Sequence, residues 1–436
     1  MKHIILGTLV LTITALIFLV YTKGDRTFGP SSVVIISVLV AFSFFCIISL
    51  IVYRSNKREA IVRIWLALIS SLVVYLAMDL GLGYFFISPV SPPIILDEHV
   101  HHRLAPNTSS EYKSRDFHYI QRVNGLGLRG SDIQSTKEKN TYSVLMLGDS
   151  FTMGKGVGDH QTFSALLQDS LNRHVDAINR KRFEVLNAGV DSYAPILSFL
   201  QLKQLAGSLV PDLIVLNLDM SDLLQEVVYR KLATYGSDGQ IVGVRSEELG
   251  QDGLSKALIT VRNWVDSDLY FSRLIRFYVQ KWGTSSSEPS VRNMVWFASR
   301  ELLRHTLADD ELDRTDQWQN IFASILSMKK YCDSHGMTFL LTIYPWGHQV
   351  NEKEWIPQRW DFIPQGALVS DRSIRIVEDF AEANSIALLN VFAAFRAYNG
   401  GRPLYYGEDM HWTPAGHELM ARELERFMLS QIIGTR

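Results

Sequence analysis

Cysteine is scarce in this 436-residue chain, which contains only Cys46 and Cys332. The two lie far apart, and Cys46 falls within a long apolar run. This spacing excludes a disulfide framework, a zinc motif of paired cysteines and a thioredoxin-like redox pair. An excess of basic charge is also lacking, with 43 Lys and Arg against 45 Asp and Glu. The chain therefore lacks the electrostatic footprint of a nucleic-acid-binding protein.

Long apolar runs are confined to the N-terminal end of the chain. Residues 4–22, 31–53 and 64–87 each reach the roughly 20 residues that a membrane-spanning helix requires. A cleaved signal peptide would account for the first run but not for two further runs behind it. We therefore expect residues 1–90 to form a membrane anchor with three transmembrane helices.

The connections between these runs predict the orientation of the anchor. Residues 54–63 carry four basic side chains, whereas residues 23–30 carry two, with Asp25 between them. Loops rich in Lys and Arg stay on the cytoplasmic side of a membrane. The pattern predicts a multi-pass protein of the cytoplasmic membrane, whose catalytic domain after about residue 90 is extracytoplasmic.

Beyond the predicted anchor, apolar segments typical of buried strands alternate with helical patterns, which favours an α/β fold with a parallel sheet. Residues 91–140 are polar and irregular and are interpreted as a linker, followed by a catalytic domain at residues 141–436. The alternation breaks down at about residues 223–317, which we interpret as an insertion. The expected strands are residues 144–147, 183–186, 213–218, 338–343 and 386–391, and the expected helices are residues 163–174, 196–205, 318–333, 373–383 and 414–432.

The first of these strands runs directly into Gly148, Asp149 and Ser150. A serine at the carboxyl end of a buried strand lies at the mouth of an open α/β sheet, where ligands bind. Its hydroxyl becomes a nucleophile when a base from elsewhere in the chain removes its proton. The tripeptide by itself is common, so the position after a strand is what makes Ser150 a candidate nucleophile.

A candidate base lies near the other end of the chain, at His411. Asp409, two residues earlier, is placed to accept a hydrogen bond from the far nitrogen of the imidazole and so fix its tautomer. Glu408, three residues before the histidine, is an alternative for that role. The alternative without catalysis is that these are polar loop residues ahead of a helix.

Candidate donors to an oxyanion follow the strands as well. The backbone amides of Ser150 and Gly189 belong to the turns after the first and second expected strands, and Ser221 belongs to the turn after the third. Parallel strands end at one edge of a sheet, so these groups are expected to face the same crevice. Glycine, serine and aspartate are also common in turns that have no catalytic role.

These motifs, in this order, resemble the SGNH (GDSL-type) hydrolase family over roughly residues 120–432. The matching positions are Gly148-Asp149-Ser150, Gly189, and Asp409-Met410-His411 with Gly416-His417 behind it. The resemblance implies a flavodoxin-like three-layer α/β fold, a Ser-His-Asp triad, and ester or acyl chemistry that needs neither cofactor nor metal.

Two positions depart from the family pattern. The family usually has Gly-x-Asn-Asp after the third strand, whereas this chain has Asp219 and Ser221 at the glycine and asparagine positions, before Asp222. Loss of one oxyanion donor typically costs about 10²–10³ in rate. The spacing of Asp409 and His411 is similar to that in alginate-type polysaccharide O-acetyltransferases of the same superfamily.

The sequence therefore predicts a membrane-anchored serine esterase that acts on an ester-linked acyl group, such as that of an acylated glycan, through a covalent acyl-enzyme. Two alternatives stay open: a polysaccharide O-acyltransferase, and a non-catalytic glycan-binding or assembly protein. His99, His101 and His102 lack further ligands at a metal-binding spacing, which favours a solvated loop. Tyr344–His348 follows the fourth strand, where a substrate wall and plain packing are equally compatible with the sequence.

Overall fold

The protein is described here by a computed structural model, which covers residues 94–133, 137–173, 182–246, 303, 305–308 and 315–433, with isolated positions between 59 and 79. The chain divides into two compact units. The fold described below belongs to the unit formed by Ser91–Gly250 and Glu288–Arg436. This unit includes the segment that the sequence predicted as a linker.

The three predicted transmembrane segments lie outside the described residues, apart from isolated positions of the third. Among the residues that the structure does describe, every helix is too short or too polar to cross a bilayer. The membrane anchor therefore stays a prediction from the sequence.

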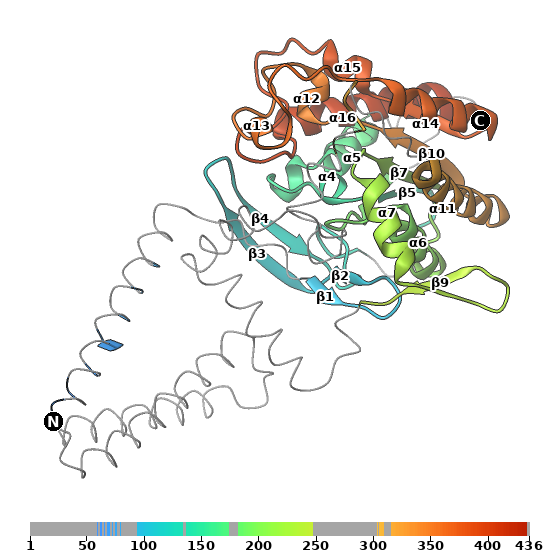
Figure 1. The fold of residues 1–436 in the computed structure, drawn as a ribbon. Helices are drawn as coiled ribbons and strands as arrows, with labels where there is room; N and C mark the ends of the chain where they lie inside the picture. The colour runs from blue at the N-terminus through green and yellow to red at the C-terminus, as the bar shows by residue number, and fades with distance from the viewer. Residues whose placement is uncertain are drawn as a thin grey trace. The chain divides into compact units, whose positions relative to one another are not determined.

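A five-stranded parallel sheet forms the centre of the unit (Figure 1). Its spatial order is β11-β10-β7-β5-β6, which, numbered along the chain and starting from β6, is the flavodoxin-like order 2-1-3-4-5. The order reverses between β5 and β7, and this switch point is where ligands bind in such sheets. The strands are β5 (Thr141–Leu147), β6 (Arg182–Asn187), β7 (Leu213–Leu218), β10 (Thr338–Ile343) and β11 (Ala387–Asn390).

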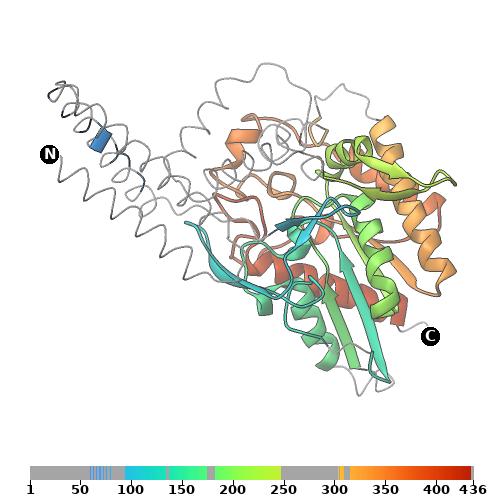
Figure 2. The ribbon, with the colours of Figure 1, turned by 90° about the horizontal axis from the view of Figure 1, so that it is seen from below.

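The strands are apolar on both sides because helices cover both faces of the sheet. Val144 and Met146 of β5 belong to one hydrophobic cluster, whereas Leu145 and Leu147 belong to the other, as the two-residue period of a strand requires. Helices α5 (Phe163–Arg173) and α16 (Pro414–Phe427) pack side by side on the first face (Figure 2). The second face is covered by α11 (Thr315–Ser334) and α14 (Arg372–Ala383), with α6 (Pro195–Leu209) contributing to both clusters.

The expected strands and helices are present with bounds shifted by a few residues. The last helix ends earlier than expected, because α16 stops at Phe427 and a π-helical turn, η4 (Met428–Ile433), follows. The start of the expected insertion contains α7 (Asp222–Lys231) and a short antiparallel hairpin of β8 (Ala233–Tyr235) and β9 (Ile241–Val244). Most of the remainder, residues 247–314, lies outside the described residues.

The segment expected to be a linker folds into two antiparallel hairpins, β1 (Ile94–Leu96) with β2 (His102–Leu104) and β3 (Thr108–Lys113) with β4 (His118–Val123). Three aromatic side chains of the second hairpin cluster with Tyr406, which comes from the loop before α16. The hairpin therefore packs against the loop that carries the candidate base. Five short helical turns complete the described elements: α4 (Ser150–Met153), η1 (Asp159–Gln161), α12 (Gly347–Val350), α13 (Arg359–Phe362) and α15 (Phe392–Arg396).

Candidate active site

Ser150 lies at the sharp turn between β5 and α4. Gly148 has a φ of +149°, and a β-carbon there would lie 2.4 Å from Oγ1 of Thr152, so only glycine fits. Asp149 caps α4 and accepts a hydrogen bond from the amide of Phe151 at 2.9 Å. Ser150 is the first helical residue, where the amide has no acceptor within the helix. The turn thus presents both the hydroxyl and the amide of Ser150 at the carboxyl end of β5, beside the switch point.

The candidate base meets this serine although 261 positions separate them. Nε2 of His411 lies 2.7 Å from Oγ of Ser150. On the other side of the ring, Nδ1 is hydrogen-bonded to Oδ1 of Asp409, which also accepts the backbone amide of His411 at 2.9 Å. Because the carboxylate accepts a hydrogen bond from Nδ1–H, the proton of the neutral imidazole stays on Nδ1. Nε2 is then free to accept a hydrogen bond from the serine hydroxyl.

Asp409, rather than Glu408, is thus the acidic neighbour of the imidazole. Glu408 is exposed, and its carboxylate lies 3.7 Å from the guanidinium of Arg115. Burial favours a higher pKa for Asp409, but the charge and hydrogen bonds of His411, together with Lys155, outweigh it and hold the pKa below its ordinary value. The carboxylate is therefore ionised when the imidazole becomes protonated.

Aromatic packing restrains the imidazole. The ring centroid of Phe151, the residue after the candidate nucleophile, lies 4.8 Å from that of His411 and 5.1 Å from that of Trp412. Tyr344 packs against both Trp412, at 4.8 Å, and Phe151, at 5.2 Å. Rotation of the histidine would disturb this cluster, so its orientation is fixed by packing as well as by Asp409.

Two of the three expected oxyanion donors are already bonded within the protein. The amide of Gly189 donates to Oδ1 of Asn187 at 3.0 Å. The hydroxyl of Ser221 donates to Oδ1 of Asp219 at 2.5 Å, and its amide donates to the same oxygen at 2.7 Å. Asp219, which stands where the family has glycine, thus holds the side chain that stands in the asparagine position.

Behind the nucleophile lies a network of buried carboxyl groups that the sequence did not reveal. The Tyr344 hydroxyl donates to Oδ1 of Asp149 at 3.0 Å, and Nε1 of Trp346 donates to Oδ2 of Asp219 at 2.8 Å. Both aromatic residues are buried, so they serve packing and support rather than an exposed substrate wall. Burial first, and then repulsion from Asp219, raises the pKa of Asp149 and of Asp222 well above the ordinary value.

The expectation of a solvated histidine loop is wrong for two of the three residues. His101 and His102 are only 7% and 6% exposed, because they pack against Tyr193 and Tyr229. Nε2 of His102 donates to the carbonyl of Asp191 at 2.8 Å, which leaves its Nδ1 to accept from Nδ1 of His101 at 2.8 Å. The pair is thus satisfied without an ion, and the described residues contain no metal-binding cluster of His, Cys, Asp or Glu.

Comparisons with known proteins give matches at the level of structure. No family model matches the chain, and no curated protein matches it. The chain is similar to solved structures of the acetyl xylan esterase AlAXEase (13% identity, 65% of this chain, 97% of that one, TM-score 0.33) and of TesA (14%, 66%, 97%, 0.33). It is also similar to that of a GDSL-like lipase from Bacteroides thetaiotaomicron (13%, 67%, 90%, 0.30). At these identities and TM-scores, we assign the function from the geometry of the site.

Proposed function

We propose that this protein is an SGNH-type serine ester hydrolase. The observation that carries the proposal is the 2.7 Å separation between Oγ of Ser150 and Nε2 of His411, with Asp409 on the opposite ring nitrogen. A nucleophile, a base and an orienting carboxylate in hydrogen-bonded sequence are the elements that acyl transfer requires. They meet at the switch point of the sheet, where a ligand can reach them.

The geometry supports a two-step reaction. Nε2 of His411 takes the hydroxyl proton as Oγ of Ser150 attacks the ester carbonyl, and Asp409 stabilises the resulting imidazolium. The tetrahedral intermediate collapses, the alcohol leaves with the proton from His411, and the acyl group stays on Ser150. Water then attacks the acyl-enzyme as His411 takes one of its protons, and His411 passes that proton to Oγ of Ser150 as the bond to the acyl group breaks and the acid is released.

The oxyanion is stabilised best by hydrogen-bond donors that already point toward it and do not have to leave another partner. The Ser150 amide is the first of these, because its position in the helix leaves it without an internal acceptor. The Gly189 amide becomes a second donor by sharing or giving up its bond to Asn187, and the Ser221 hydroxyl becomes a third only by leaving Asp219. Turnover is therefore slow compared with enzymes that have a free asparagine donor.

The proposal includes a setting and a substrate class. The apolar runs of residues 1–90 anchor the enzyme in the cytoplasmic membrane as a multi-pass protein, with the catalytic unit on the extracytoplasmic side. The substrate is an ester-linked acyl group, such as that of an acylated glycan. If a sugar hydroxyl takes the place of water in the second step, the same acyl-enzyme performs O-acyl transfer.

Labelling with a fluorophosphonate probe tests the proposal, because only an activated serine reacts. Purified protein should be labelled, and Ser150→Ala and His411→Ala should each abolish the labelling. Exposed Ser334 gives a matched control, since Ser334→Ala should label like the native protein. No labelling of the native chain at any pH would overturn the proposal and favour a non-catalytic glycan-binding or assembly protein. Acetyl release, compared with acetyl transfer to an oligosaccharide, then separates hydrolase from transferase.

A further inference from the structure

The loop directly after α4, the short helix that begins at Ser150 and is called the nucleophile helix below, holds a lysine in a fixed backbone position. Lys155 stands between Gly154 and Gly156, whose φ angles are +87° and +96°. A β-carbon on Gly156 would lie 2.6 Å from the ring of Tyr406, so this position accepts no larger residue without movement. The amide of Lys155 donates to the carbonyl of Ser150 at 3.0 Å. The backbone of Lys155 is thus tied to the nucleophile itself.

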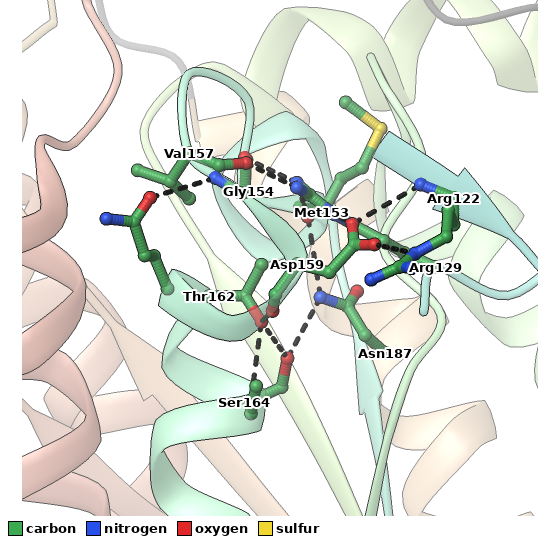
Figure 3. A network of polar contacts seen from close by, with 12 residues as sticks. Arg122, Arg129, Met153, Gly154, Val157, Asp159, Thr162, Ser164 and Asn187 are labelled. Carbon is green, nitrogen blue, oxygen red and sulfur yellow. Dashed lines mark hydrogen bonds and ion pairs between the residues drawn. The ribbon is translucent and has the colours of Figure 1, made fainter. Parts of the chain in front are cut away.

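A buried guanidinium fastens the same loop (Figure 3). The Arg129 side chain, 1% exposed, donates to the carbonyl oxygens of Met153 at 2.6 Å, Gly154 at 2.5 Å and Val157. Its Nε lies 3.2 Å from Oδ1 of Asp159, which balances the charge. Three carbonyls held by one planar cation make the loop rigid.

The turn after β6 brings a carboxylate to the same place. Gly189 packs directly on the nucleophile helix, since a β-carbon there would lie 2.2 Å from the Met153 amide, and Val190 donates to the carbonyl of Gly148 at 3.1 Å. Asp191 is the next residue, and its carbonyl is held by His102. Two loops whose backbones are hydrogen-bonded to the turn that carries Ser150 therefore carry side chains of opposite charge.

Lys155 and Asp191 interact electrostatically but keep their hydrogen-bonding capacity. Burial lowers the pKa of the Lys155 ammonium, but the carboxylates of Asp191 and Asp409 outweigh it and raise the pKa. Both side chains are partly exposed. Within the described residues, neither the Lys155 ammonium nor the Asp191 carboxylate has a hydrogen bond or an ion pair closer than 4 Å. The two loops that adjoin the nucleophile turn thus offer unused donors and unused acceptors.

We propose that Lys155 and Asp191 form a hydroxyl-binding subsite that recognises the sugar ring bearing the acyl group. Neighbouring sugar hydroxyls each donate and accept hydrogen bonds, which matches an ammonium beside a carboxylate. An acidic sugar fits less well, because the carboxylates of Asp191 and Asp409, which both interact with the Lys155 ammonium, would repel the negative charge of such a ligand. A simple alkyl or aryl ester has no hydroxyl to place there. This inference rests on the proposed esterase function and gives it a substrate class.

Kinetics with two acyl donors test the subsite. The variants are Lys155→Met and Asp191→Asn, and the matched surface controls are Lys203→Met and Asp169→Asn, both at exposed positions. The donors are partially acetylated xylo-, manno-, cello- and chito-oligosaccharides and 4-nitrophenyl acetate. Each subsite variant should lose about tenfold to a hundredfold in kcat/KM on the oligosaccharide that the native enzyme prefers, as expected for a lost hydrogen bond to a charged group. Hydrolysis of 4-nitrophenyl acetate should fall by a much smaller factor in both subsite variants than hydrolysis of the oligosaccharide, and the controls should change neither reaction.

Three other outcomes overturn the subsite. Equal losses on both donors, with a shifted acid limb of the pH profile, would assign Lys155 an electrostatic effect on the His411–Asp409 pair instead. Unchanged kinetics on the oligosaccharides would exclude contact with the sugar. A native enzyme that hydrolyses 4-nitrophenyl acetate but none of the oligosaccharides would refute the subsite and leave the esterase intact. By contrast, absence of fluorophosphonate labelling is a failure of the esterase proposal itself.

Discussion

At the scale of single residues, the position of the imidazole depends on one short acidic side chain. Oδ1 of Asp409 accepts both the amide and Nδ1 of His411. The two-residue spacing makes this double acceptance possible, because the carboxylate closes a turn on the backbone of the histidine that it orients. Glu408 points to Arg115 instead. The spacing that departs from the family pattern is therefore compatible with a working triad.

Asp409→Asn should lower kcat about 10²–10⁴-fold, because an amide in place of the carboxylate no longer fixes the productive tautomer or stabilises the imidazolium. Glu408→Gln is the matched control and should leave kcat within twofold. Steady-state hydrolysis of 4-nitrophenyl acetate measures both. A large loss in Glu408→Gln together with a small loss in Asp409→Asn would reverse the assignment of the acid.

The pairing of Ser150 with His411 could be predicted from the sequence, because each belongs to a recognisable motif. Ser150 lies just after a buried strand, and His411 lies just before α16. The sequence could not show whether the Gly189 amide and the Ser221 hydroxyl are free to bind an oxyanion. Hydrogen bonds to nearby side chains decide this, and a sequence motif does not specify side-chain conformations. The burial of His101 could not be read locally either. Apart from Val100, its nearest neighbours along the chain are polar, and Tyr229, whose ring packs against it, comes from a distant position.

At the scale of elements, the strands of the central sheet were predictable because both faces are covered and the apolar runs are continuous. The hairpins before the sheet were not. Strand β4 alternates exposed and buried positions over His118–Val123, and one of its buried residues is the polar Gln121. A short strand whose buried face includes polar side chains carries little periodic signal, so its existence depends on packing against the rest of the unit.

A buried glutamate joins the three helices α7, α6 and α11. Oε2 of Glu226, on α7, accepts the amide of Ile196 at the start of α6, at 2.9 Å. Oε1 accepts the hydroxyl of Ser324 on α11 at 2.5 Å and Nε of Arg230 at 3.1 Å. Burial is the larger effect and raises the pKa of Glu226 to about 7, although Arg230 opposes it.

This raised pKa makes the stability of the unit depend on pH in a definite direction. Because the folded state binds the Glu226 proton more tightly than the unfolded state, the group stabilises the fold fully below about pH 4.5. That contribution, about 1–3 kcal/mol, is lost as pH rises through about 7. Urea unfolding of native protein and Glu226→Gln at pH 5, 6, 7 and 8 should show the native advantage shrinking as pH rises.

Glu382→Gln, at an exposed position of α14, is the control for this measurement and should follow the native curve at every pH. Parallel pH dependences for the native protein and Glu226→Gln would contradict the expectation. They would mean that the carboxylate titrates near its ordinary pKa in the folded state.

At the scale of the whole molecule, the chain combines a unit that carries the candidate active site with an apolar N-terminal region. The first described strand, β1, begins at Ile94, seven residues after the last predicted membrane segment at residues 64–87. So short a connection keeps the catalytic unit close to a bilayer surface if residues 1–90 span it. The substrate then has to be a glycan or ester within reach of the membrane.

Single introduced cysteines decide the orientation. The two native thiols should not react with the maleimide, because Cys332 is fully buried and Cys46 lies within the second predicted span. Lys139→Cys, at an exposed position of the catalytic unit, should react with a membrane-impermeant maleimide in intact cells. Lys57→Cys, in the basic connection predicted to be cytoplasmic, should react only after the membrane is permeabilised. The reverse pattern would place the unit with the candidate active site in the cytoplasm. Labelling of both cysteines in intact cells would place both on the outer side, so that residues 64–87 between them would not cross the membrane.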